Sequence, residues 1–174
     1  MKKTVLTLAI TLTSICAFAQ QGEKAAGLNL SYGTEIKNLG IGIKGQYGIT
    51  DAIRAEASFD YFLKKEGLSM WDVNFNFHYL FPLSDKLKVY PLAGLSYTNW
   101  KLDISDVWDD LDDYYDDDWD SDDSSSSTGK FGINLGGGIQ YNITDMVTVS
   151  FEAKYQLIND FDQMIFGFGV AYKF

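Results

Sequence analysis

The last eleven residues, MIFGFGVAYKF, place an apolar or aromatic side chain at every second position. The even-numbered positions of 164–174 are all apolar or aromatic, whereas the odd-numbered ones hold Ile165, glycine, alanine and lysine. Successive side chains of a β-strand point to opposite faces, so this pattern predicts a strand with one solid apolar face. Either a second sheet or lipid must cover that face, and this requirement limits the folds open to the chain.

The same alternation recurs in seven earlier segments, which predicts eight strands in all. The fifth strand is ambiguous in parity, because Tyr90 and Leu92 are apolar on the face opposite to Val89, Pro91 and Leu95. We expect Val89 and the residues that share its face to lie on the outer, apolar side of the sheet. The seven segments are 26–32, 41–47, 53–61, 71–79, 89–97, 131–141 and 147–157.

The opposite face of these strands carries polar and charged side chains of both signs. It holds asparagine, glutamine, serine and many glycines, besides His78 and nine charged residues: Lys44, Arg54, Glu56, Asp60, Asp72, Lys130, Glu152, Lys154 and Lys173. Strand spacing alone does not exclude a soluble lipocalin-like lipid carrier, whose interior is apolar. Mixed charges favour a narrow polar lumen in which the charges pair, with aromatics near the strand ends forming an interfacial girdle.

The N-terminus has the features of a secretory signal peptide. Lys2 and Lys3 precede a short apolar stretch that ends in Ala17, Phe18 and Ala19, which predicts cleavage before Gln20. Residues 1–19 are therefore interpreted as the signal and residues 20–174 as one barrel domain. The only cysteine, Cys16, lies in the signal, so we expect no disulfide and no sulfur metal site in the mature chain. No cofactor is expected either.

The connections between the strands alternate in character. Three of them repeat a Thr-Asp or Ser-Asp pair, at Thr50, Ser84 and Thr144, whereas EIKNLG, LKKEGLS, NDFDQ and a long acidic stretch form the other set. Short turns opposite longer loops are typical of an up-and-down transmembrane β-barrel, with periplasmic turns and extracellular loops. The fold class expected is thus an all-β, eight-stranded antiparallel transmembrane barrel.

With these features the chain resembles the small eight-stranded outer-membrane barrels that include opacity-type proteins and the OmpA transmembrane domain. Gly167, Gly169, Tyr172 and Phe174 look like the terminal-strand signal of that group, which the outer-membrane assembly machinery recognises. The resemblance implies an outer-membrane location, contact with outer-membrane lipid and with that machinery, and a monomeric state.

An enzyme that modifies lipid A is the sharpest alternative within this fold. Acyl transfer or hydrolysis needs a nucleophile with a base, such as serine with histidine. The only histidine is His78, and the deacylase barrels carry a His-x-Ser pair where this chain has Leu80 two residues after it. We therefore expect a non-enzymatic protein in which His78 is hydrogen-bonded among Asn76 and the lumen charges.

The stretch 103–128 is interpreted as an Asp-rich extracellular loop. Twelve aspartates lie in 103–123, and the acidity of the mature chain is confined to them, since the remaining charges balance at 12 against 12. A negative surface argues against nucleic acid. Such a run often serves only for solvation, yet its aromatics suit a binding role for divalent cations or a basic protein surface, with four anchors: Trp108, Tyr114, Tyr115 and Trp119.

The function expected is therefore presentation of extracellular loops by an outer-membrane barrel, for surface interaction and adhesion or for envelope integrity. The lipid A-modifying enzyme and the lipocalin-like carrier stay as the alternatives.

Deleting Phe174 is expected to slow insertion into the outer membrane of living cells while leaving refolding into detergent largely intact. The residue is the last of the terminal-strand signal, which acts through recognition. Pulse-labelling in cells and refolding of purified protein measure the two rates. An equal loss in both settings would show that Phe174 acts through packing alone.

Overall fold

A computed structural model of the chain describes residues 22–65, 68–103, 125–159 and 161–174. These residues form strands and turns, and none of their segments is a helix capable of crossing a membrane. The expected signal peptide, 1–19, lies outside the described residues.

Eight long strands and one strand of two residues account for nearly all of the described chain. Their bounds are β1 Lys24–Gly33, β2 Asn38–Gly48, β3 Ile53–Lys65, β4 Leu68–Tyr79, β5 Phe81–Pro82, β6 Leu87–Asp103, β7 Ser125–Asn142, β8 Val147–Ile158 and β9 Gln163–Lys173.

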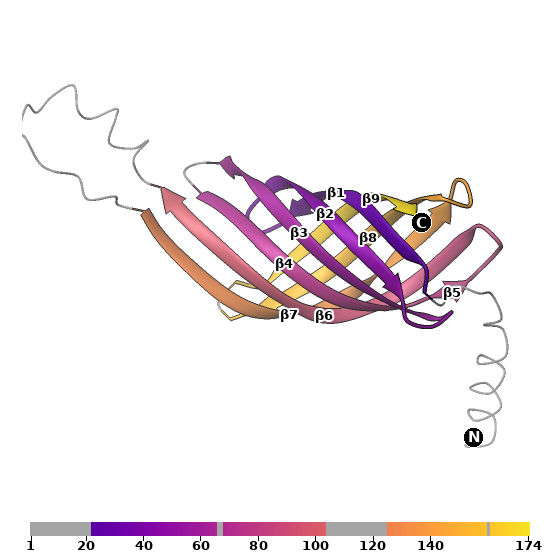
Figure 1. Cartoon of the computed structure of the whole chain (residues 1–174). Coiled ribbons are helices and arrows are strands. Elements are labelled where there is room, and N and C mark those ends of the chain that lie inside the picture. The colour runs from indigo at the N-terminus through magenta and orange to yellow at the C-terminus, as the bar shows by residue number, and fades with distance from the viewer. Residues whose placement is uncertain (1–21, 66–67, 104–124, 160) are drawn as a thin grey trace, which may run out of the picture.

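The eight long strands close into one antiparallel barrel (Figure 1). Each pairs with the next along the chain, with β4 pairing β6 directly and β5 adding only two residues at the edge of β6. Closure comes from β1 and β9, which pair from Ala25 with Lys173 to Gly33 with Ile165. The eight-stranded up-and-down barrel expected from the alternation is confirmed.

The outer surface of the barrel is apolar and its interior is polar. Leu28, Ile43 and Leu95 face outward and are 64 %, 62 % and 63 % exposed, whereas Asn74 and Asn134 point inward and are completely buried. No water-soluble protein leaves so many large apolar side chains uncovered, so this surface faces lipid. The lipocalin arrangement, apolar inside and polar outside, is the reverse of what the structure shows.

The ambiguous parity of β6 is resolved as expected. Pro91 and Leu95 face outward, while Tyr90 and Leu92 are buried in the lumen. Outward aromatics also form a contact series across neighbouring strands, with ring centroids 6.1 Å apart for Phe59 and Trp71 and 5.0 Å apart for Tyr97 and Phe131. These contacts lie on the lipid-facing surface of four successive strands, β3, β4, β6 and β7.

The repeated Thr-Asp and Ser-Asp pairs cap the turns at one end of the barrel. The Thr50 hydroxyl accepts a hydrogen bond from the Ile53 N–H, and Thr144 accepts one from Val147, each at 2.9 Å. Ser84 accepts the equivalent bond from Leu87 at 3.2 Å. The hydroxyl replaces a backbone acceptor in each turn, which explains why the pair recurs.

The connections at the opposite end are shorter than expected. Strands take in five of the seven residues of LKKEGLS, half of EIKNLG and the last residue of NDFDQ, leaving 34–37, 66–67 and 159–162 between strands. Polar residues there belong to strand ends above the lipid, where polarity does not indicate a loop. The expected loop 103–128 also overlaps its flanking strands, because Asp103 pairs with Ser125 and Trp100 pairs with Thr128.

Apolar clusters close the lumen at both ends. Leu80, Tyr90 and Leu92 pack together near the short turns. At the other end Phe161 packs against Trp100, with ring centroids 4.6 Å apart, as part of a larger cluster: Ile36, Phe62, Met70, Trp100, Ile158 and Ile165. An eight-stranded barrel has an interior that side chains just fill, and these clusters fit that description.

Glycines make the space for the larger lumen side chains. Gly138 pairs with Tyr90 across β6 and β7, and a Cβ on Gly138 would lie 2.6 Å from the Tyr90 ring. Gly45 faces outward, and a Cβ there would meet nothing within 4 Å.

Replacing Gly138 by alanine should lower the free energy of unfolding by about 1–3 kcal/mol, because the added methyl overpacks the lumen against a buried ring. Gly45→Ala is the matched control on the lipid face and should leave stability unchanged or slightly raised. Equilibrium urea unfolding in lipid vesicles measures both variants. Equal effects would mean that the lumen is loosely packed at Tyr90.

Candidate functional site: the charged lumen

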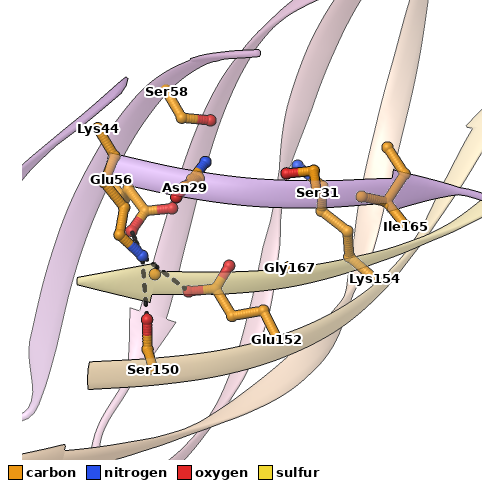
Figure 2. Close-up of a pocket in the computed structure, with 11 residues that line it drawn as sticks. Asn29, Ser31, Lys44, Glu56, Ser58, Ser150, Glu152, Lys154, Ile165 and Gly167 are labelled. Carbon is orange, nitrogen blue, oxygen red and sulfur yellow. Dashed lines mark hydrogen bonds and ion pairs between the residues drawn. The ribbon is translucent and has the colours of Figure 1, made fainter. Parts of the chain in front are cut away.

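Lys44 of β2 is the centre of a buried charge cluster (Figure 2). Its ammonium nitrogen lies 3.7 Å from a carboxylate oxygen of Glu56 on β3 and 3.7 Å from one of Glu152 on β8. It also donates a hydrogen bond of 3.1 Å to the Ser150 hydroxyl. One cation thus compensates two carboxylates that are largely removed from water. These contacts join β2 to β8 across the lumen.

The register of β2 with β3 explains one of the two ion pairs of Lys44, the one with Glu56. Lys44 pairs with Ser58, so Glu56 lies on one diagonal and Asp60 on the other. The ion pair with Glu56 follows directly from that register. Asp60 instead accepts hydrogen bonds from Asn29 at 2.9 Å and Ser31 at 3.0 Å. Asn29 and Ser31 lie on β1, so these two bonds of Asp60 reach across β2, while Ser58 of its own strand donates a third at 3.3 Å.

Arg54 organises a second group of lumen side chains around His78. Its guanidinium Nη2 lies 2.8 Å from Nδ1 of His78, and Nη1 donates to Gln140 on β7 at 2.5 Å. The His78 ring stacks on Tyr90 at 4.7 Å between centroids, and the Tyr90 hydroxyl donates to Glu152 at 2.6 Å. His78 is therefore held by Arg54 and Tyr90, and the expected hydrogen bond with Asn76 is replaced by these contacts.

A layer of amides continues the cross-lumen connections beyond the charges. The Asn134 side chain on β7 donates to Asn74 and Asn76 on β4, at 2.9 Å in both cases. Gln156 on β8 donates to Asp72 on β4 at 3.1 Å. These bonds connect strands that are not neighbours in the sheet.

A small cavity lies beside Lys44 and is bordered by two glycines of β9. A Cβ on Gly169 would lie 2.5 Å from the Lys44 nitrogen, so this glycine leaves room for the ammonium. Gly167 borders the same cavity, and a Cβ there would meet only Ser31 at 3.9 Å. Gly169, expected only as part of an assembly signal, thus has a packing role that sequence reasoning missed.

Glu56, His78 and Glu152 bring three metal-ligand atoms within 4.8 Å of one another. Two features oppose a metal site. Lys44 already supplies the positive charge between the carboxylates. Arg54 only donates, so the Nδ1 atom of a neutral His78 accepts and the ring proton sits on Nε2, the nitrogen that faces Glu56. Metal-binding histidines have the opposite arrangement, with the second nitrogen donating to an acceptor.

The same geometry limits nucleophilic chemistry in the lumen. The Ser150 hydroxyl contacts the amine of Lys44, which is committed as a cation between two carboxylates. The Tyr90 hydroxyl donates to one of these carboxylates, Glu152. His78 is 1 % exposed and faces the lumen rather than the lipid. The described lumen residues therefore form a connected network of ion pairs and hydrogen bonds.

The residues expected to act in assembly lie on β9 and at its end. Tyr172 and Phe174 are 51 % and 73 % exposed on the outer surface, and the Phe174 N–H donates to the Lys24 carbonyl at 2.9 Å. The four expected aromatic anchors of the acidic segment lie outside the described residues: Trp108, Tyr114, Tyr115 and Trp119.

Replacing Lys44 by methionine should destabilise the barrel by roughly 3–5 kcal/mol, because two buried carboxylates lose their counter-charge. Adding Glu152→Gln to Lys44→Met should recover part of this loss, whereas Ser150→Ala alone should have a small effect. Urea unfolding in vesicles, followed by tryptophan fluorescence, gives the three values. A change near zero for Lys44→Met would show that water compensates the carboxylates.

Comparisons with known proteins agree with this architecture. Residues 5–174 match the family model of the outer membrane protein beta-barrel domain. No curated protein matches the sequence.

Several solved barrels have a similar fold at low sequence identity. The N-terminal barrel domain of Pseudomonas aeruginosa OprF is 17 % identical, with a TM-score of 0.68, and the match covers 88 % of this chain and 98 % of that one. Neisserial surface protein A is 16 % identical, with a TM-score of 0.63 and coverage of 87 % and 96 %.

Ail, the attachment invasion locus protein of Yersinia pestis, is 17 % identical, with a TM-score of 0.60 and coverage of 88 % and 99 %. At these identities the likeness shows the fold alone. The family model spans nearly the whole sequence, and the apolar exterior fits a membrane location. The chain belongs to the outer membrane protein β-barrel domain family and is a small eight-stranded barrel of the outer membrane.

Proposed function

We propose that this protein presents the acidic segment 104–124 at the cell surface, where it binds partners that carry positive charge. One observation carries the proposal. The pairing of β6 with β7 continues for seven residue pairs after the pairing of β7 with β8 has ended at Gly132 and Ile158. At about 3.3 Å per residue, roughly 20 Å of the β6–β7 pair, here called the ribbon, extends past the end of β8. On its other side the ribbon is flanked by β4, which pairs with β6 as far as Leu102.

The ribbon ends where the acidic segment begins (Figure 1). Residues 104–124 contain eleven aspartates, more than any other part of the chain, together with Trp108, Tyr114, Tyr115 and Trp119. Carboxylates favour divalent cations and basic protein surfaces, and aromatic side chains are common anchors in interfaces.

The negative charge of residues 104–124 favours positively charged partners over negatively charged ones. Ail has been solved with sucrose octasulfate, a heparin analogue, which is a polyanion. A segment with eleven aspartates repels a polyanion, so a partner of the opposite sign is proposed for this chain.

A non-enzymatic role is part of the proposal. It is supported by the burial of His78 in the lumen and by the commitment of Lys44 to two carboxylates. Lipid A from cells with and without the gene should give identical mass spectra, and a difference of one acyl or polar group would favour the enzyme.

Replacing residues 104–124 by a short Gly-Ser turn should leave outer-membrane localisation and the altered gel migration of unheated protein intact, since longer loops close at a cost of only ~0.6 kcal/mol per doubling. Binding of calcium ions and of cytochrome c, a basic protein, should fall at least tenfold, and in the parent it should weaken with added salt. Retention of all binding by the deleted form would mean that the segment only solvates.

Two further variants separate charge from aromatic anchoring. Replacing Trp108, Tyr114, Tyr115 and Trp119 by serine keeps every aspartate, so a purely electrostatic segment would bind cytochrome c unchanged. Replacing the eleven aspartates by asparagine keeps the aromatics and should abolish the salt dependence.

A further inference from the structure

Two buried aspartates face each other across neighbouring strands, farther from the short turns than the charge cluster of Lys44. Asp60 of β3 and Asp72 of β4 are a direct cross-strand pair, and they are 2 % and 0 % exposed. Like charges placed directly opposite each other destabilise a sheet. Something in this part of the lumen therefore has to compensate two negative charges at once.

The cations of the lumen supply only part of that compensation. Lys44 and Arg54 balance the two glutamates, Glu56 and Glu152, so Lys154 of β8 is left for the two aspartates. Among the described residues, the ion pairs within 4.0 Å include neither Lys154 nor either aspartate. This part of the lumen thus carries one surplus negative charge.

The other lysines of the inner face lie at the two mouths of the barrel. Lys88 is at the start of β6 near the short turns, and Lys173 at the same end pairs with Glu23 at 3.4 Å. Lys130 lies at the opposite mouth, where its ammonium donates to the Asn159 carbonyl at 2.7 Å. Their charges are therefore directed to the rims and away from the aspartate pair.

Neutral donors hold the Asp60 carboxylate in place. It accepts hydrogen bonds from Asn29 and Ser31 of β1, and it lies so close to Gly42 that a Cβ on this glycine would collide with it.

The Asp72 carboxylate is held in the same manner. It accepts hydrogen bonds from Asn74 at 2.8 Å and from Gln156 of β8 at 3.1 Å. Amides and hydroxyls satisfy lone pairs of both carboxylates, but they carry no net charge, so the surplus remains.

A buried hydroxyl without a partner lies beside the same pair. Thr98 of β6 is the direct cross-strand neighbour of Asp72 and is completely buried. Its hydroxyl oxygen makes no hydrogen bond to any described residue, although buried polar groups are nearly always bonded. Asp60, Asp72 and Thr98 thus form a row of three oxygen-bearing side chains on three adjacent strands, all on the lumen face.

We propose that Asp60, Asp72 and Thr98 bind one small monovalent cation, such as sodium, inside the lumen. Carboxylate and hydroxyl oxygens are the ligands that hard cations prefer. A single positive charge is sufficient because Lys154 supplies the other, whereas a divalent ion would leave a surplus of the opposite sign.

The sodium dependence of stability tests this site, because an ion that binds only the folded barrel stabilises it. The full-length protein is unfolded with urea in phosphatidylcholine vesicles, while sodium chloride is exchanged for choline chloride at constant total concentration. The free energy of unfolding should rise by about 1.4 kcal/mol for each tenfold increase in sodium once the site is saturated. A flat response of the parent protein would overturn the proposal.

Three variants locate the effect. Asp72→Asn removes the surplus charge and one ligand, so its stability should be independent of sodium and, in choline chloride, should exceed that of the parent. Thr98→Val keeps both carboxylates and should shift the onset of the sodium effect to about fivefold higher concentration, since a neutral hydrogen-bonding group contributes ~1 kcal/mol. Asp145→Asn, at an exposed position of a short turn, is the matched charge control and should respond like the parent. Retention of the sodium effect in Asp72→Asn, or its loss in Asp145→Asn, would contradict the site.

A proton on one aspartate would also remove one charge, and the same measurements distinguish it from a cation. Stability that rises on acidification and ignores sodium would favour the proton and reject the cation. Sodium-23 NMR gives an independent readout, in which the parent should broaden the sodium resonance more than Asp72→Asn does. The aspartates of 104–124 are present in both proteins and contribute equally. Equal broadening by the two proteins would reject the lumen site.

Discussion

Lipid offers no hydrogen-bond partner to a backbone, and this constraint determines the rest of the fold. An open sheet of eight strands would leave two rows of unpaired backbone groups in the membrane, each group costing several kcal/mol. Pairing of β1 with β9 removes both rows at once. The exterior then has to be apolar, and the polar side chains have only the lumen in which to lie.

A lumen of this width sets its own conditions on the sequence. Eight strands leave space that side chains just fill, so each long side chain needs a small neighbour. Gly138 beside Tyr90 and Gly169 beside Lys44 show this complementarity. Charges in such a space must be compensated by other side chains, as Lys44 does for Glu56 and Glu152.

Features that depend on neighbouring residues were predictable from the sequence. Side-chain parity follows from the period of a strand, and the position of Lys44 relative to Glu56 follows from the length of one turn. The partnership of Lys44 with Glu152 joins β2 to β8, which are far apart in the sequence and are brought near each other only by the pairing of β1 with β9, so no local pattern encodes it. Likewise the contact of Arg54 with Gln140 joins strands that are not neighbours, whereas Arg54 and His78 are a direct cross-strand pair of β3 and β4.

The boundaries of the strands were the weakest expectation, for a physical reason. A strand that leaves the membrane no longer needs an apolar face, so alternation stops before the hydrogen-bonded ladder does. Residues 125–128 show this, because their composition is that of a loop while their backbone pairs with β6. The apolar cluster of Phe62, Met70 and Trp100 was missed for the same reason, since it lies near the ends of the alternating segments.

Residues that contact one another across the lumen are far apart in the sequence, and this separation affects the order in which the contacts form. Lys44 and Ser150 are 106 positions apart, and Arg54 and Gln140 are 86 apart. Contacts so distant in the chain form late, because loop closure must precede them. Until the first and last strands meet, the charged face of a half-formed sheet has no counter-charges and would be costly to expose to lipid. Insertion of the apolar face and closure of the polar one are therefore coupled steps, and the partly assembled sheet has to keep its inner face in water.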